Sequence, residues 1–486
     1  MILRVSDLSS SVSDSLAHAG HRLAGLFTPT LRLGVTGLAR SGKTVFITAL
    51  IRNLTQGGRL PFFEPYAAGR ILAATLEPQP DDNVPRFDYE RHLDALSADP
   101  PHWPESTRRV SELRVSLAFV STHPLRRALG IRRLNLDIVD YPGEWLLDLA
   151  MLGASYADWS REALAQAREP GRTGLAAEWL AFASSLDADA PEDETAALEG
   201  ARRFTDYLQR VRATSAVAAL GPGRFLMPGD LEGSPLLTFF PLDTAPGTAP
   251  RRGSLAAMMA RRYDSYVQHV VRPFFREHFS RLDRQIVLVD VLGALNGGAA
   301  AALELERALA SVLEAFRPGA ASWLASLAGA RRIDRLLFAA TKADHIHHTS
   351  HDRLEAILRL LTERAAARAG AAGAEARTMA LAALRATREV EARDGAAVLP
   401  CIAGVPLPGE RVGNELFDGK REVVVFPGDL PADPAAALAG EAPLGATFPR
   451  FRPPRLAPAT TAGDVPPPPH IRLDRALDFL IGDWLS

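Results

Sequence analysis

Continuous apolar runs recur along this chain and indicate strands that are buried on both faces. Such runs, typical of a parallel sheet covered by helices, occupy residues 31–36, 134–140, 285–290 and 335–340. At 111–120 apolar and polar positions alternate, which predicts a strand with one buried face. Ala-rich helical segments at 300–330 and 352–372 flank the run at 335–340, and this alternating order predicts an α/β fold.

Between residues 150 and 280 the spacing of apolar positions becomes helical. The segment is rich in Ala, Leu, Arg and Glu, and Met258–Arg272 predicts an amphipathic helix whose apolar stripe lies in a core. A loop with Gly and Pro at 222–243 interrupts the helices. Near the end of the chain Arg421–Phe426 predicts a short strand. The closing helix has one apolar face, formed by Leu473, Leu477, Leu480 and Trp484.

We therefore expect one discontinuous core that carries an insertion and an extension. The expected parts are an N-terminal helical segment (1–27), an α/β core (28–150 and 281–395), a helical insertion domain (151–280), a β extension (396–446), a Pro-rich linker (447–469) and a docking helix (470–486). The 486 residues thus form one large core with additions instead of three independent domains.

Composition narrows the class of protein. Hydrophobic residues make up 47% and charged residues 23%, so the chain can bury a sizeable core. With 55 Lys and Arg against 57 Asp and Glu, the net charge of −2 excludes the basic balance of a nucleic-acid-binding protein. The single Cys401 allows no internal disulfide, and the start of the chain has no signal-peptide pattern, so we expect a cytoplasmic protein. No apolar run is long enough to predict a transmembrane helix.

Only three of the 55 basic residues are lysines, namely Lys43, Lys342 and Lys420. A lysine that persists in so arginine-rich a chain indicates a position that needs a compact ammonium group, because the planar guanidinium does not fit the same place. Lys420, in the turn Asp418-Gly-Lys, is predicted to be an exposed hairpin residue. The other two lysines lie in motifs with a recognisable chemistry.

The first of these motifs, GLARSGKT at Gly37–Thr44, fits the P-loop pattern GxxxxGK[ST]. An apolar strand precedes it and a helix-forming segment follows it, as a P-loop requires. Backbone N–H groups at the helix start would hold phosphates, Lys43 would reach the β- and γ-phosphates, and Thr44 would coordinate Mg²⁺. A Gly-rich surface turn is the alternative. The residues expected to contact nucleotide are Gly37, Ala39, Arg40, Ser41, Gly42, Lys43, Thr44 and Val45.

The second motif, Thr341-Lys-Ala-Asp344, ends the strand at 335–340 and resembles the guanine-recognition motif of Ras-like GTPases, usually NKxD. The stem of Lys342 would lie along the purine, and the Asp344 carboxylate would accept hydrogen bonds from guanine N1–H and the 2-amino group. Adenine offers neither donor. An exposed Lys-Ala-Asp helix start is the alternative. Ala383 and Leu384 resemble the SAK or SAL loop, which contacts guanine O6 through backbone N–H groups.

Two strands end in DxxG, the pattern in which an aspartate holds Mg²⁺ through water and a glycine N–H meets the γ-phosphate. We assign this role to Asp140 and Gly143, because their strand closely follows the expected antiparallel partner at 111–120, as in Ras-like proteins. The rival, Asp290-x-x-Gly293, is expected to be a structural strand end. A strand followed by a Pro-Gly turn is the remaining alternative.

The segment WPEST at Trp103–Thr107 precedes the half-buried strand and has the place of switch I. Thr107 is the candidate whose hydroxyl closes over Mg²⁺ in the triphosphate state. Ser106 is the nearby alternative, and an ordinary turn threonine is the other.

As a set, these strings resemble the YcjX-like family, which are bacterial stress-associated proteins of the P-loop GTPase class. The resemblance spans nearly the whole chain and rests on GLARSGKT (37–44), WPEST (103–107), DYPGEWLLDL (140–149), SYADWS (155–160), PGRFLMPGDLEG (222–233), VDVLGALNGG (289–298), TKAD (341–344), LAALRATRE (381–389) and HIRLDRALDFLIGDWL (470–485). It implies a cytoplasmic nucleotide-binding protein, often encoded beside a membrane-associated partner of the YcjF type in a phage-shock-like stress context. The expected fold class is an α/β P-loop NTPase, a Ras-like GTPase core with a mainly helical insertion and a C-terminal β/helix extension.

Hydrolysis would need residues beyond these motifs. Where Ras-like proteins have a water-orienting glutamine, this chain has Glu144. Glu144 is either a catalytic base or an acidic residue that stabilises a helix N-terminus. GLARSGKT is similar to GLYRTGKS of guanylate-binding proteins, in which the arginine acts as a finger in cis after dimerisation. The resemblance implies this role for Arg40, together with a homodimer; an arginine that faces solvent is the alternative. The catalytic candidates are Arg40, Lys43, Thr107, Gly143 and Glu144.

Three functions compete at this point. The first is a slow, Mg²⁺-dependent GTPase that switches conformation between GTP and GDP. The second is a P-loop ATPase or phosphotransferase in which TKAD plays no part. The third is a scaffold that binds nucleotide for stability, without significant hydrolysis, and docks a stress or membrane partner.

A cluster of four histidines follows TKAD, namely His345, His347, His348 and His351. No cysteine or recognised ligand spacing accompanies them. We therefore expect a polar loop here in preference to a metal site.

Overall fold

The computed structural model describes residues 28–38, 40–105, 109–128, 130–214, 221–244, 249–314, 333–395, 397–439, 447–457 and 467–486. The helical segment expected over 1–27 lies outside these residues, as do part of the Pro-rich linker and the second half of the helix expected at 300–330. Among the helices of the described ranges, none is long and apolar enough to cross a membrane.

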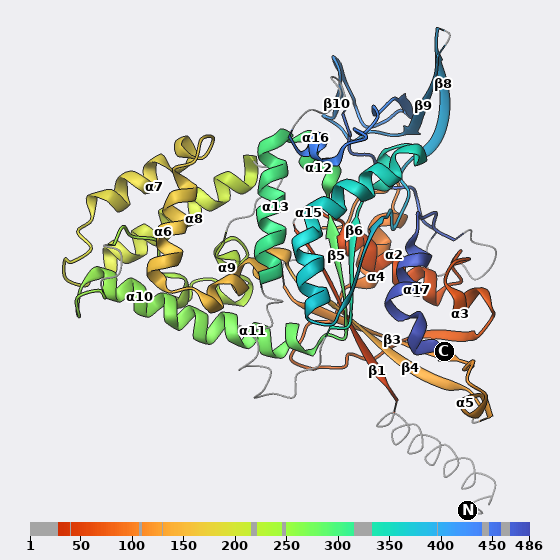
Figure 1. Ribbon diagram of the computed structural model, residues 1–486, viewed down its shortest axis with the longest axis horizontal. Coiled ribbons are helices and arrows are strands. Elements are labelled where there is room, and N and C mark those ends of the chain that lie inside the picture. Colours follow the sequence, from red (N-terminus) through yellow and green to blue (C-terminus); the bar gives the residue numbers. More distant parts are fainter. Residues whose placement is uncertain are drawn as a thin grey trace, which may run out of the picture.

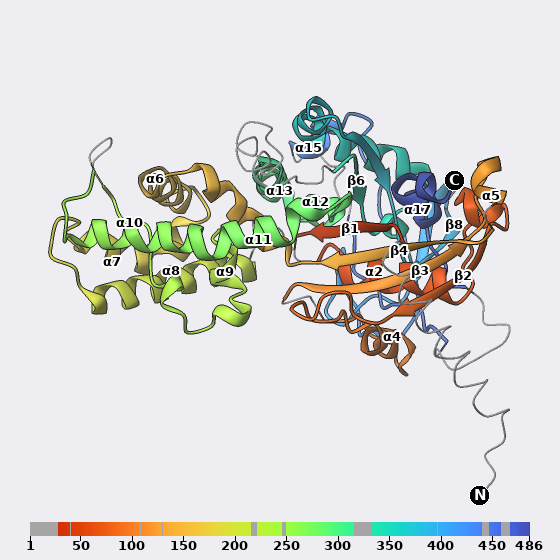
Figure 2. The ribbon, with the colours of Figure 1, turned by 90° about the horizontal axis from the view of Figure 1, so that it is seen from below.

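A seven-stranded sheet forms the centre of the molecule, with strand order β2-β3-β4-β1-β5-β6-β7 (Figures 1 and 2). Its strands are β1 (Thr30–Gly37), β2 (Ile71–Glu77), β3 (Ser111–Phe119), β4 (Arg132–Asp140), β5 (Arg284–Val289), β6 (Arg335–Ala340) and β7 (Glu375–Ala380). The strands from β4 to β7 in this order run parallel, and β3 pairs antiparallel with both β2 and β4. The five predicted strands of the core are confirmed.

The edge strand β2 has no counterpart in the sequence analysis. Its seven residues, Ile-Leu-Ala-Ala-Thr-Leu-Glu, do not alternate cleanly, and Leu72 is exposed. Two adjacent alanines give the segment little intrinsic preference for a strand. Pairing with β3 across the sheet therefore decides its conformation.

Helices cover both faces of the sheet. On one face α2 (Lys43–Thr55) and α4 (Tyr89–Ser97) share a core with the closing helix α17 (Leu473–Ile481), whose three predicted leucines are completely buried. On the other face α12 (Val291–Asn296), α13 (Gly298–Glu314) and α15 (His351–Ala371) pack against β5 and β6. Alternate residues of β5 divide between these two cores, because successive side chains of a strand point to opposite faces.

Between β4 and β5 the chain leaves the sheet and forms a mainly helical region beside it (Figure 1). After the connecting segment η1 (Gly143–Gly153), the elements of this region are α6 (Tyr156–Ala167), α7 (Thr173–Ser185), α8 (Glu194–Thr214), α9 (Gly223–Leu226), η2 (Gly229–Leu231), η3 (Pro235–Leu237), α10 (Leu255–Tyr266), η4 (Val267–Val271), α11 (Arg272–Glu277) and η5 (Phe279–Arg281). The core of this region is aromatic, with Trp179 stacked on Tyr207 at 5.2 Å between ring centroids. Met258, Met259 and Tyr263 of α10 are buried, which confirms the predicted core stripe.

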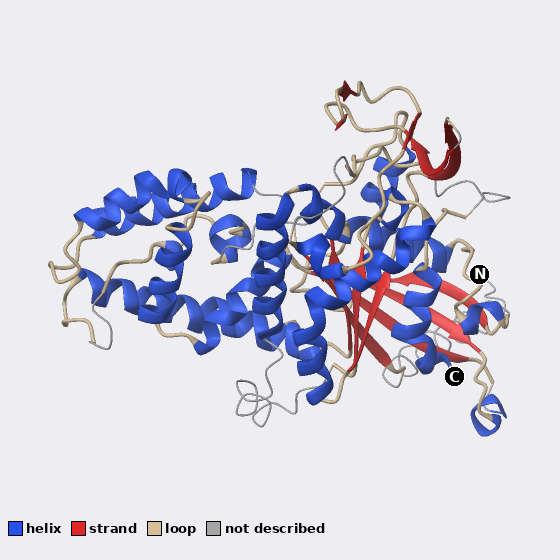
Figure 3. Cartoon of the chain, turned by 45° about the horizontal axis from the view of Figure 1, so that its top comes forward, coloured by secondary structure: helices blue, strands red, loops and turns tan. Residues whose placement is uncertain are grey.

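The C-terminal extension contains a small sheet of its own, which lies apart from the central sheet in Figure 3. Its strands β8 (Arg388–Asp394), β9 (Ala397–Gly404) and β12 (Val423–Val425) have the order β12-β9-β8. The expected boundary at 395 therefore separates two paired strands, and β8 belongs with the extension. No change of composition marks its start, because β8 follows the last core loop directly. Lys420 is exposed, as predicted.

Short elements complete the described part of the chain. They are the helices α3 (Glu64–Ala67), α5 (Pro124–Ala128) and α16 (Pro434–Leu438), the hairpin strands β10 (Arg411–Val412) and β11 (Glu415–Leu416), and the single turns η6 (Ala343–His345), η7 (His348–Ser350) and η8 (Gly482–Leu485).

Candidate nucleotide-binding site

The GLARSGKT motif forms the turn between β1, which ends at Gly37, and α2, which begins at Lys43. The backbone is left-handed at Arg40 (φ 65°) and Gly42 (φ 88°), and the Arg40 side chain is exposed. Lys43 is buried and its Nζ donates a hydrogen bond of 2.6 Å to the Gly37 carbonyl. A helix N-terminus and an ammonium group thus meet at one loop, an arrangement that attracts phosphate. Ala39 lies outside the described residues.

Two hydroxyl groups lie in the same turn. Ser41 is almost completely buried, and within the described ranges its Oγ has no hydrogen-bond partner, which makes it a candidate donor to a ligand. Thr44 Oγ1 donates to the carbonyl of Glu105 at 3.4 Å, so the segment predicted as switch I reaches the start of α2. Ser106 and Thr107 lie outside the described residues, and the role of Thr107 stays a prediction.

The DxxG segment after β4 approaches the same turn. Asp140 is buried and lines a cavity of about 760 Å³, whose walls share Trp103 and Pro104 with the pocket described below. Three residues further on, Gly143 packs on the P-loop backbone, where a Cβ atom would lie 2.1 Å from the Gly37 carbonyl oxygen. Glycine permits this approach, because any side chain would collide with the main chain.

The rival aspartate, Asp290, has a different environment. Its Oδ1 accepts a hydrogen bond of 2.9 Å from the Gly293 amide and so caps the N-terminus of α12. Its Oδ2 forms an ion pair with Nζ of Lys342, which has left-handed backbone at φ 61°. Capping and pairing engage both oxygens of Asp290, as expected for a structural strand end.

The TKAD loop joins a second loop that is distant in sequence. The buried Asp344 carboxylate accepts a hydrogen bond of 2.7 Å from the Ala386 amide, and the hydroxyl of Thr387 donates to the Asp344 carbonyl. Ala343 N–H donates to the carbonyl of Leu381 at 3.1 Å. Because Thr341 and Asp344 are buried, the alternative of an exposed helix start does not hold.

These loops enclose one pocket of about 360 Å³, within the size range of small-molecule sites. Its walls combine the P-loop, the TKAD loop and the loop at 381–384 with residues from remote parts of the chain. The lining residues are Arg40, Ser41, Gly42, Lys43, Thr44, Val45, Phe46, Trp103, Pro104, Glu144, Arg212, Thr341, Lys342, Asp344, His345, Leu381, Ala382, Ala383, Leu384, Leu407, Arg450 and Phe451.

Several lining residues carry no signal in the sequence. Arg450 and Phe451 come from the segment predicted as the Pro-rich linker, and Trp103 Nε1 donates a hydrogen bond of 2.6 Å to the Phe451 carbonyl across 348 positions. Arg212, at the end of α8, lies 3.2 Å from the buried carboxylate of Glu144. No motif marks these positions, since only the folded chain brings them to the pocket.

Known proteins resemble this chain over nearly its whole length. The chain matches the YcjX-like family, DUF463, over residues 31–485. It belongs to this family. A member named "Ras-like GTPase YcjX" from Escherichia coli (strain K12) is 40% identical over 469 residues, which cover 94% of this chain and 96% of that protein. A second protein of the same name, from Shewanella oneidensis, is 34% identical over 478 residues, covering 94% and 95% of the two chains.

A solved structure of the signal recognition particle receptor SRb-GTP/SRX complex from Chaetomium thermophilum is also similar to this YcjX-like chain. The match has 15% identity and covers 76% of this chain and 95% of that chain. Its TM-score is 0.23, so the likeness carries no argument here. The fold class rests on the sheet, the P-loop and the family: the chain is an α/β P-loop NTPase with a Ras-like core.

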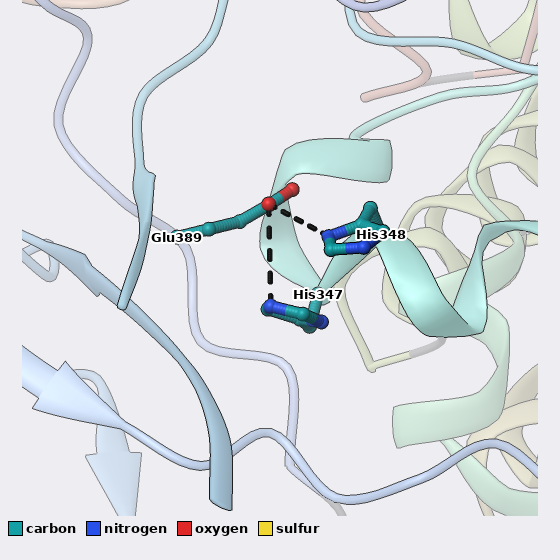
Figure 4. Close-up of side chains that lie close together, drawn as sticks. All are labelled: His347, His348 and Glu389. Atoms are coloured by element: carbon teal, nitrogen blue, oxygen red, sulfur yellow. Dashed lines mark hydrogen bonds and ion pairs between the residues drawn. The ribbon is translucent and has the colours of Figure 1, made fainter. Parts of the chain in front are cut away.

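The histidines after TKAD divide into two environments. His345 lines the nucleotide pocket and His351 Nε2 lies 2.8 Å from the Ala343 carbonyl, and burial lowers the pKa of both. His347 and His348 instead face Glu389 of β8, with His348 Nδ1 at 2.8 Å and His347 Nε2 at 4.0 Å from its Oε2 (Figure 4).

These last three side chains could hold a divalent ion, because one ligand atom of each lies within 4.8 Å of the others. Burial acts to raise the pKa of Glu389, but the hydrogen bond from His348 and the nearby charges of His348, Arg385 and His347 together outweigh burial, so that pKa is lowered. The exposed His348 and Glu389 thus also contact each other directly through a hydrogen bond. These three side chains lie beside the TKAD loop and do not line the pocket described above.

Proposed function

We propose that this YcjX-like protein binds guanine nucleotides and hydrolyses GTP to GDP and phosphate. The observation that carries the proposal is that Lys43 and Asp344, which follow β1 and β6, line the same pocket. The first residue suits phosphates and the second suits guanine. Relatives with names that denote a Ras-like GTPase support the proposal.

Asp344 would select the base. Its carboxylate is buried, so bringing adenine to it would leave a buried acceptor without the two donors that guanine supplies. The Ala386 amide holds one carboxylate oxygen in place before nucleotide arrives. Lys342 would cover the purine with its stem, and the amides of Ala383 and Leu384 would face guanine O6.

Thr44 and Asp140, together with Thr107, would hold Mg²⁺. A hydroxyl on the first turn of α2 and a buried carboxylate at the end of β4 form an all-oxygen donor set, which suits this ion. When bound, Mg²⁺ neutralises charge on the β- and γ-phosphate oxygens. Lys43 and the N–H groups of Gly42, Lys43 and Gly143 would contact phosphate oxygens from the protein side.

In the reaction a water oxygen forms a bond to the γ-phosphorus while the bond from that phosphorus to the β–γ bridging oxygen breaks. Glu144, at the position of the usual glutamine, is paired with Arg212, and this pairing favours slow turnover. Arg40 is exposed on the P-loop and would reach the γ-phosphate in its own pocket, as a finger in cis, once a homodimer has formed. Because the Glu144 carboxylate is already paired with Arg212, it also favours the second candidate function, a nucleotide-stabilised scaffold without significant hydrolysis.

Equilibrium competition between GTP and ATP tests the proposal. Wild-type protein should prefer GTP, and Asp344→Asn should lose this preference and gain affinity for xanthine nucleotides. Asp352→Asn, a matched change at an exposed carboxylate on the first turn of α15, should behave as wild type. Equal binding of ATP would favour the ATPase, and turnover at background with Mg²⁺ and K⁺ present would favour the scaffold.

We further propose a cytoplasmic stress-response role with a membrane-associated partner of the YcjF type. This part rests on family resemblance alone. Cell fractionation before and after heat stress tests the location. Crosslinking in cells that contain or lack the YcjF-type protein tests the partner.

A further inference from the structure

One basic side chain of the helical region reaches the nucleotide pocket. Arg212 lies in the last turn of α8, and of the residues that line the described pocket it is the one from 151–280. It shares that pocket with the P-loop residues Ser41, Lys43 and Thr44. A cation supplied by an inserted region is therefore present where the phosphates would lie.

The contacts of Arg212 leave most of its hydrogen-bonding capacity unused. Within the described part of the chain, Nη2 donates to Glu144 Oε1 at 3.2 Å and Nη1 lies 3.1 Å from the sulfur of Met227. A guanidinium has five N–H donors and prefers to grip a carboxylate or phosphate with two of them. The single hydrogen bond to Glu144 thus uses one of these donors, and the Arg212 side chain is 29% exposed.

The helical region is nevertheless fixed firmly to the segment that carries Glu144. A Cβ atom on Gly223 would lie 2.1 Å from the Glu144 carbonyl oxygen, so the two backbones are in direct contact. Arg224 covers the ring of Trp145 at 3.3 Å from its centroid, and Trp145 Nε1 donates to the Met227 carbonyl at 3.1 Å. Met227, which contacts Arg212, is therefore held against the segment that carries Glu144. This packing limits the ordering that Arg212 needs when it meets a ligand.

We infer that Arg212 is a ligand of the terminal phosphate of a bound nucleoside triphosphate and that Glu144 holds it when that phosphate is absent. The inference rests on the proposed function and deepens it. A phosphate with two negative charges and three acceptor oxygens outcompetes one carboxylate for a guanidinium. As the bond to the leaving oxygen breaks, Arg212 stabilises the charge that spreads over the transferring group.

This role differs from the one proposed for Arg40. Arg40 is exposed on the P-loop of the same pocket and is expected to act in cis only after a homodimer has formed, whereas Arg212 lies in the pocket without any partner chain. The contribution of Arg212 to turnover should therefore not require dimerisation. The side chain that precedes it by two positions, Arg210, pairs with Glu178 at 2.7 Å on the exposed surface and provides a matched control.

The test compares Arg212→Ala, Arg212→Lys and Arg210→Ala with wild-type protein. Single-turnover GTP hydrolysis in Arg212→Ala should fall by about a thousandfold, with unchanged GDP affinity and loss of the complex with GDP and aluminium fluoride. Arg212→Lys should recover only part of the rate, because it lacks the planar fork. Arg210→Ala should match wild type in all three measurements.

Two results would overturn the inference. One is a wild-type rate and a retained aluminium fluoride complex in Arg212→Ala. The other is a parallel loss of GDP affinity and melting temperature, which would make Arg212 merely structural. If wild-type protein does not hydrolyse GTP, the proposed function fails, but binding measurements still test the inference. Arg212→Ala must then bind a non-hydrolysable triphosphate analogue about tenfold more weakly than wild type, with an unchanged affinity for GDP.

Discussion

Tyr266 donates a hydrogen bond of 2.6 Å to the buried carboxylate of Asp148. Asp148 lies in η1, a few residues after DxxG, and Tyr266 ends α10, so this bond ties the helical region to the segment beside the P-loop. The Gly223 amide donates to the other carboxylate oxygen. Burial raises the pKa of Asp148 to about 6, although both hydrogen bonds favour the ionised form.

Asp148 should make stability depend on pH. Its folded pKa of about 6 exceeds the value of about 3.9 in an unfolded chain, so the folded state binds this proton more tightly. The resulting stabilisation is complete below pH 4 and is lost as the pH rises through 6, by up to about 3 kcal/mol. Denaturant unfolding of wild type and Asp148→Asn between pH 4 and 7 should show this difference in slope. Parallel curves would contradict it.

Gly143→Ala should disrupt the phosphate end of the pocket. The added methyl group would meet the Gly37 carbonyl, which is main chain and can yield only if the P-loop moves. We expect the free energy of unfolding to fall by about 1–3 kcal/mol and nucleotide affinity to fall with it. Gly153→Ala is the control, because nothing lies within 4 Å of its added Cβ atom. Calorimetric titration with GDP and urea unfolding check both effects, and equal behaviour of the two variants would refute the contact.

Lys43→Ala should weaken nucleotide binding, whereas Lys420→Ala should not. Lys43 is buried at the P-loop, and the loss of a charge-assisted hydrogen bond to phosphate costs about 1.5–3 kcal/mol, or about 10- to 150-fold in affinity. Lys420 is exposed, and within the described residues the hydrogen bond of this residue runs from its backbone amide to the side chain of Asp418. Fluorescence titration with a labelled guanine nucleotide measures both. Similar affinities in the two variants would argue against Lys43 as a phosphate ligand.

Glu144→Gln should favour the triphosphate over the diphosphate. Removing the charge of Glu144 releases Arg212 from its ion pair, so the affinity for a triphosphate analogue relative to GDP should rise by about 5- to 10-fold. The pH dependence of the single-turnover rate provides a second readout, because a catalytic base at this position would be lost in the variant. A fall in the affinity ratio would show that Glu144 does not restrain Arg212.

The motifs could be found in the sequence because each works through local backbone geometry. GLARSGKT requires only a strand, a tight turn and a helix start, all of which lie within about twenty consecutive residues. TKAD and DxxG are likewise fixed by where a strand ends. The preference for Asp140 over Asp290 followed from strand order, and in the structure Asp290 caps a helix and pairs with Lys342.

Which distant side chains lie against these motifs was decided by the tertiary structure alone. Phe451 lies 348 positions from Trp103 and Arg212 lies 68 positions from Glu144, and separations of this size leave no periodic trace in a sequence. The edge strand β2 and the extension strand β8 were missed or misplaced for the same reason, since pairing with β3 and β9 sets their conformation. Local patterns in the sequence thus determined the P-loop and the TKAD loop. Long-range packing determined which side chains complete the pocket between these two loops.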